Sequence, residues 1–143
     1  MSTTPTVTPR PMKYVRPEVA NGKKIVKLCR TDRMIGAIQV LTHGGETNLH
    51  SHAHSDGLWF VLSGRVRFYG PEDNVIGEYG RYEGGLIPRE CPYWFEAVGD
   101  EIAELLQVEA FDKSIPDDKT LFADRTDYKP RSRTASTMID AAS

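Results

Sequence analysis

The sequence predicts an all-β fold, either a sandwich or a small barrel. Three observations favour it: short apolar runs recur about every 8–12 residues, turn signals containing Gly and Pro separate them, and no segment has the pattern of a long helix. The length of 143 residues suits one domain that buries a substantial core. We therefore expect a β-structure whose interior is either filled with side chains or holds a small ligand.

The two ends of the chain differ in composition from its centre. Residues 1–17 are rich in Thr and Pro and predict a flexible N-terminal arm. Residues 112–143 carry many charges and few large apolar side chains. They predict a loosely packed C-terminal extension, anchored by Leu121 and Phe122, whose last ten residues are disordered. Residues 18–111 remain as the barrel.

The expected strands follow one another between turn signals. Residues 55–57, Ser-Asp-Gly, are expected to form a turn before the most apolar strand of the chain. Residues 101–111 contain Glu, Ala and Leu, which favour a helix, but the length of the run and the preceding strands favour a final strand. The expected strands cover residues 23–29, 34–42, 50–54, 58–69 with a turn at 63–64, 75–79, 91–98 and 101–111.

Charge and hydropathy argue against two classes of partner. The chain has 18 Lys and Arg against 20 Asp and Glu, and the net charge of −2 speaks against nucleic acid or an anionic membrane. No apolar run approaches the roughly 20 residues that cross a bilayer, and the N-terminus lacks the order of a secretory signal, so we expect a cytoplasmic protein. Cys29 and Cys91 stand far apart, which favours two reduced thiols over a disulfide.

All the histidines of the chain lie close together, at His43, His50, His52 and His54. In an extended strand, alternate side chains share a face, so His50, His52 and potentially His54 project to one side. Neutral imidazoles that converge in this way can hold a divalent metal ion. The alternative is an exposed strand end whose histidines face water.

The spacing around these histidines has the form of a known motif. Gly44 is followed by five residues, then His50-Ser51-His52, four residues, Gly57, six residues and Gly64. This pattern resembles the first motif of the cupin superfamily, whose fold is a double-stranded β-helix, or jelly roll. The family's motif has a glutamate where this chain has Gly57.

The second cupin motif is matched only in part, and Tyr93 stands where the family has a histidine. The resemblance covers roughly residues 34–111. It implies a metal site that includes His50 and His52, and it leaves the third ligand open between His54 and Tyr93.

The resemblance also implies a function. The metal ion would be Fe2+ in the first place, with Zn2+, Ni2+ or Mn2+ as alternatives. Trp59, Val61 and Tyr93 would line a pocket for a small, partly apolar organic substrate, and Tyr93 would act as a catalytic acid or base. We expect dioxygenase-type chemistry ahead of isomerase or lyase chemistry. The alternative is a non-catalytic cupin that binds or senses a small ligand with a degenerate metal site. Cupins often pair, so we also expect a homodimer, with the N-terminal arm reaching across.

Overall fold

The computed structural model describes residues 7–42, 48–115, 120–122 and 137–141, and it confirms the all-β prediction. Within these residues the regular structure consists of strands and one short 3₁₀ turn, and no helix is long and apolar enough to cross a membrane. The elements are β1 (Lys23–Arg30), β2 (Met34–Leu41), β3 (His50–His52), β4 (Ser55–Ser63), β5 (Val66–Tyr69), η1 (Pro71–Asp73), β6 (Val75–Tyr79), β7 (Gly84–Ile87), β8 (Trp94–Ala97), β9 (Ala103–Phe111), β10 (Thr120–Phe122) and β11 (Thr137–Asp140).

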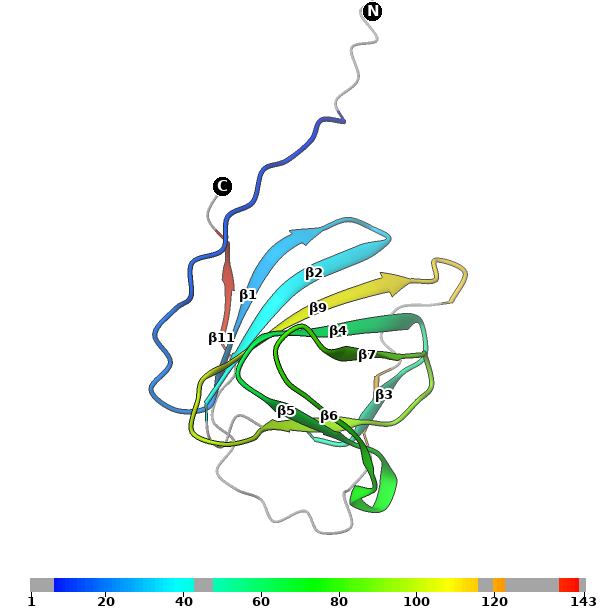
Figure 1. Ribbon diagram of the computed structural model, residues 1–143. Coiled ribbons are helices and arrows are strands. Elements are labelled where there is room, and N and C mark those ends of the chain that lie inside the picture. Colours follow the sequence, from blue (N-terminus) through cyan, green and yellow to red (C-terminus); the bar gives the residue numbers. More distant parts are fainter. Residues whose placement is uncertain (1–6, 43–47, 116–119, 123–136, 142–143) are drawn as a thin grey trace, which may run out of the picture.

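The strands form two facing sheets around one interior (Figure 1). One sheet has the order β11-β1-β2-β9-β4-β7, and the strands β6-β5-β8 form the sheet opposite, with β3 and β10 paired beside it. The pairs within the described residues are antiparallel, except for β1 and β11, which run parallel. Two antiparallel sheets that close on each other in this way make a jelly roll.

Alternation along the strands decides which side chains face the interior. In β4, Trp59 and Val61 are buried, whereas Asp56 and Leu58 are exposed. The buried side chains of both sheets meet in one core cluster, which consists of Leu41, Trp59, Val61, Val66, Phe68, Ile87, Tyr93, Phe95, Ala97, Ala103 and Leu105. Burying this apolar surface is the main force that closes the barrel.

The structure decides between helix and strand for residues 101–111. β9 pairs with β2 along one edge and with β4 along the other, and its first buried residues, Ala103 and Leu105, alternate with more exposed ones. The predicted final strand is confirmed, because pairing on both edges outweighs the helical propensity of its Glu, Ala and Leu residues.

The turn predicted at residues 55–57 is wrong. β4 begins at Ser55, and the break between β3 and β4 falls at Ala53 and His54. Gly57 lies within the sheet, paired with Ile87 of β7 on one side and with Glu109 of β9 on the other. Because Gly57 has no side chain, neighbouring side chains can pack against it in the interior, and the chain does not turn at this residue.

The C-terminal extension contributes two strands. Residues 120–122, which include Leu121 and Phe122, form β10 against β3, and residues 137–140 form β11 against β1. The expected disorder of the last ten residues therefore does not hold for residues 137–140. The boundaries of the arm and the extension stay predictions, and His43 and Gly44 lie outside the described residues.

The N-terminal arm contacts its own barrel. The Tyr14 hydroxyl donates a hydrogen bond to the carboxylate of Glu104, and Arg16 lies 3.7 Å from the same carboxylate. Arg10 donates to the backbone carbonyl of Arg30 at 3.3 Å. Glu104 stands on the outward side of β9, between the inward-facing Ala103 and Leu105. These contacts place residues 10–16 along the outside of the large sheet.

Candidate functional site

The structure brings three of the predicted site residues together. His50 and His52 project from the same side of β3, and their ring centres lie 4.9 Å apart in an edge-to-face arrangement. The backbone of Tyr93 pairs with that of His50 through hydrogen bonds of 2.8 and 3.1 Å. The Tyr93 ring centre lies 4.5 Å from that of His50 and 6.2 Å from that of His52.

Both imidazoles are neutral at neutral pH. Burial lowers the pKa of His50 to about 4 and also lowers the pKa of His52. Nδ1 of His50 lies 2.7 Å from the carbonyl oxygen of Asn48. A carbonyl only accepts, so Nδ1 donates and the lone pair of the ring is on Nε2. A second hydrogen bond of this kind fixes the orientation of many metal-binding histidines.

Tyr93 is a buried, protonated phenol. Its side chain is packed against Trp59, with 5.8 Å between the ring centres, and its hydroxyl lies 3.5 Å from Nε2 of His52. Burial raises the pKa of Tyr93 well above its usual value, and the negative charge of Glu109 raises it further. The hydroxyl is therefore protonated at neutral pH and can donate a hydrogen bond.

Trp59 and Val61 form an apolar wall beside these groups. Both are buried on the inner side of β4, and the Trp59 ring centre lies 5.1 Å from that of Phe95 on the facing sheet. The predicted pocket residues thus belong to the core cluster that encloses the site. Such a wall excludes water and suits a partly apolar ligand.

A row of polar side chains crosses the inner face of the large sheet. Lys23 on β1 donates to Gln39 on β2 at 3.5 Å, and Gln39 donates to Gln107 on β9 at 2.9 Å. Gln107 then donates to Oε1 of Glu109 at 3.2 Å. Burial lowers the pKa of Lys23 to about 8, since the charged amine loses water there. We call Lys23, Gln39, Gln107 and Glu109 the polar row.

The sequence interpretation missed the polar row, although a signal for it existed. Gln107 and Glu109 have the parity of Ala103 and Leu105, which makes them inward-facing once residues 101–111 are a strand. A glutamate at an inward position of a buried strand is uncommon and marks a site of interest.

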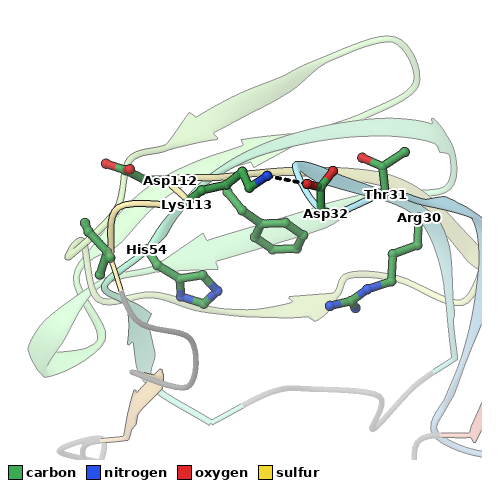
Figure 2. A pocket seen from close by; sticks show the side chains of 8 residues that line it. Arg30, Thr31, Asp32, His54, Asp112 and Lys113 are labelled. Atoms are coloured by element: carbon green, nitrogen blue, oxygen red, sulfur yellow. Dashed lines mark hydrogen bonds and ion pairs between the residues drawn. The ribbon is translucent and has the colours of Figure 1, made fainter.

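His54 lies in a different environment from His50 and His52. Its ring stacks on Phe111 with 5.4 Å between ring centres and an interplanar angle of 11°. It lines a pocket of about 600 Å³ at the ends of β1 and β9, and Figure 2 shows His54 on one side of this pocket with Arg30 and Asp32 on the other. We call this the outer pocket, lined by Arg30, Thr31, Asp32, His54, Phe111, Asp112, Lys113 and Ile115. A role for His54 as third metal ligand stays a prediction.

Solved structures resemble the fold of this chain. An uncharacterized conserved protein with a double-stranded β-helix domain from Klebsiella pneumoniae has a TM-score of 0.65 at 18% identity, covering 78% of this chain and 87% of that one. An RmlC-like cupin family protein from Methanocaldococcus jannaschii has a TM-score of 0.61 at 16% identity, covering 73% and 93%. An RmlC-like cupin protein from Desulfovibrio desulfuricans has a TM-score of 0.57 at 22% identity, covering 73% and 96%.

This protein has the cupin fold. The resemblance predicted from the histidine motif is therefore confirmed as a resemblance of structure. No protein-family model and no curated protein sequence matches the chain. Identities at this level establish the fold of this protein, and its chemistry has to be argued from its own residues.

The donor atoms of this interior can be compared with what a metal ion needs. Among the residues that the structure describes, no three His, Cys, Asp or Glu side chains already form a cluster that could hold a metal ion. His50 and His52 nevertheless offer two neutral imidazoles, and Glu109 is 5% exposed with no hydrogen-bond partner for Oε2 in the described part of the chain. A buried carboxylate oxygen without a partner is costly, and a cation would satisfy it. The donors therefore fit a divalent metal ion in kind.

Proposed function

We propose that this small cupin binds a divalent metal ion through His50 and His52 and acts on a small organic molecule inside the barrel. The observation that carries the proposal is the pair of neutral imidazoles, 4.9 Å between ring centres, on a strand whose sequence resembles the cupin metal motif. Metal binding requires the neutral ring, and the burial of both rings supplies it without competition from protons.

The donor set leaves room for a substrate. Two imidazoles with at most one carboxylate are typical of Fe2+ sites that keep open positions, and Zn2+, Ni2+ or Mn2+ also accept such ligands. A bound ion would supply either redox chemistry with oxygen or polarisation of a substrate carbonyl. We place dioxygenase-type chemistry first and isomerase or lyase chemistry second, because a substrate that chelates through two oxygens suits an open site.

The chain's own residues would position and protonate this substrate. The raised pKa of Tyr93 keeps its proton on the hydroxyl, which lies beside His52 and can donate a hydrogen bond to a substrate oxygen. The predicted role of Tyr93 as a catalytic acid or base requires that a bound ion or substrate lower this pKa again. Trp59 and Val61 would hold the apolar part of the molecule and exclude water.

A second candidate function is the binding or sensing of a small ligand without catalysis. The polar row favours it, because the amine of Lys23 and the amides of Gln39 and Gln107 offer hydrogen bonds to a polar organic molecule with no metal ion. The partner in both cases is a small molecule inside the barrel.

Metal analysis of the purified protein separates the two candidates. After loading with Fe2+ under nitrogen, or with Zn2+, Ni2+ or Mn2+, we expect about one ion per chain in the wild type. His50→Ala and His52→Ala should lose the ion. His54→Ala tests the sequence prediction that His54 is the third ligand: a loss of the ion would support that prediction, whereas the place of His54 in the outer pocket leads us to expect that the ion is kept. Oxygen uptake by the Fe2+-loaded protein with catechols and β-diketones then separates dioxygenase from isomerase or lyase chemistry.

Two results would count against the proposed function. One is a wild type that takes up none of the four metals, and the other is equal metal content in the wild type, His50→Ala and His52→Ala. The cytoplasmic location and the homodimer stay predictions, and a monomeric mass in light scattering would contradict the latter.

A further inference from the structure

The carboxylate of Glu109 fills the space that the side chain of residue 57 would occupy. Gly57 and Glu109 are direct partners in the ladder between β4 and β9. A Cβ atom added to Gly57 would lie 2.8 Å from Oε1 of Glu109 and 3.0 Å from Nε1 of Trp59. Gly57 is the residue that stands in the place of the cupin glutamate, so a carboxylate is present at this point of the interior although the motif lacks it.

The carboxylate of Glu109 is held in place on one side only. Gln107 donates to Oε1, and the polar row behind Gln107 extends to Lys23. Oε2 has no partner in the described part of the chain, and neither has the indole Nε1 of Trp59. Burying a carboxylate with one oxygen unsatisfied is unfavourable, so stability alone does not account for a glutamate here.

A series of contacts connects Glu109 with the predicted metal site. The Cβ atom added to Gly57 would meet both the carboxylate of Glu109 and the indole of Trp59, so these two groups border the same space. The Trp59 ring centre lies 5.8 Å from that of Tyr93, and the Tyr93 hydroxyl lies 3.5 Å from Nε2 of His52. Glu109 on β9 and the histidines on β3 therefore approach the same pair of aromatic side chains from two different sheets.

We propose that Glu109 is the metal-binding carboxylate of this cupin, supplied from β9 in place of the glutamate that the first motif lacks at Gly57. The inference rests on the proposed function, in which His50 and His52 bind the metal ion. It gives the site two histidines and one carboxylate, a set with open positions for substrate. Oε2 of Glu109 then gains in the loaded protein the partner that it lacks among the described residues.

The first test replaces the charge of Glu109 and keeps its shape. In Glu109→Gln we expect the dissociation constants for Mn2+ and Zn2+, measured by competition with a fluorescent chelator, to rise by more than about tenfold. The thermal midpoint of the metal-free protein should stay the same or rise, because a poorly satisfied buried carboxylate is removed. A purely structural role predicts the reverse, a lower midpoint and unchanged affinity. The matched control is Glu101→Gln, an exposed carboxylate close to the start of the same strand.

The second test moves the carboxylate back to the strand where the cupin motif has it. Gly57→Glu alone should destabilise the fold, because its Cβ would meet the carboxylate of Glu109. Glu109→Gly removes that contact. The double variant Gly57→Glu with Glu109→Gly therefore carries the carboxylate on β4 instead of on β9. We expect its metal affinity to return to within about threefold of the wild type, since neighbouring substitutions are not additive.

The outcomes separate this inference from the proposed function. Wild-type affinity in Glu109→Gln, when His50→Ala and His52→Ala have lost the metal, overturns the inference and leaves the proposed function standing. No metal in the wild type overturns both. A folded double variant that binds no better than Glu109→Gly also overturns the inference. If the double variant does not fold, the visible spectrum of Co2+ bound to Glu109→Gln decides: an altered spectrum supports the inference, and a wild-type spectrum overturns it.

Discussion

The barrel interior and the outer pocket both combine imidazole, aromatic and acidic side chains, yet they treat their charges differently. In the outer pocket Lys113 forms an ion pair with Asp32, and both side chains are more than half exposed (Figure 2). In the interior, an oxygen of Glu109 and the indole nitrogen of Trp59 are buried and have no partner within the described residues. The acidic group of the outer pocket, Asp32, therefore has a cationic partner, whereas Glu109 in the interior has one carboxylate oxygen without a partner among the described residues.

This difference shows which of the two regions is prepared for a ligand. An exposed ion pair contributes little to stability, and water satisfies its remaining hydrogen-bonding capacity. A buried carboxylate without a full set of partners reduces the free energy of unfolding, and a bound cation reverses that effect. The imidazoles of His50 and His52 lie in this interior with 4.9 Å between their ring centres, whereas that of His54 stacks on Phe111.

Lys23→Met is the variant expected to change stability most among those that leave the metal donors intact. Burial lowers the pKa of Lys23 from 10.5 to about 8, so the folded state binds fewer protons than the unfolded state between these values. The stability of the wild type therefore rises with pH across this window. Below pH 8 we expect Lys23→Met to be more stable than the wild type by on the order of 2–3 kcal/mol. The advantage should disappear towards pH 10.5.

Urea unfolding at pH 7 and pH 10 checks this prediction. Equal differences between variant and wild type at the two pH values would mean that the amine of Lys23 is not desolvated. The control is Lys113→Met, because Lys113 in the outer pocket is 53% exposed and its amine keeps its contact with water.

Lys113→Met tests the outer pocket, and of the variants considered it should change stability least. Its ion pair with Asp32 is exposed to solvent, and such pairs contribute little. We expect no measurable change in the urea midpoint at either pH, and no change in metal content. A clear shift of the urea midpoint would show instead that this exposed ion pair contributes to stability.

Most of the fold could be predicted because alternation and turn chemistry act locally. The apolar runs of β2 and β9 and the polar turns between strands are visible in the sequence, and the structure confirms both strands. The turn predicted at residues 55–57 is wrong because a glycine in a sequence indicates either a turn or a strand position where a neighbouring side chain needs the space. Here the glycine accommodates Glu109 from the neighbouring strand, a contact that depends on tertiary pairing.

The residues of the candidate site could likewise be predicted only where local geometry decides their position. His50 and His52 could be predicted, since two histidines at alternate positions of a strand share a face by geometry alone. Glu109 could not be connected with them, because that requires the register between β4 and β9. The environment of His54 depended on where the chain breaks after β3, and single residues such as Ala53 give no clear signal for it.

Anomalous diffraction from crystals loaded with Mn2+ shows directly whether Glu109 binds the metal ion together with His50 and His52. We expect one anomalous peak inside the barrel, in contact with Nε2 of His50, an imidazole nitrogen of His52 and the carboxylate of Glu109. No peak between these side chains at saturating Mn2+, or a peak beside His54 in the outer pocket instead, would contradict it.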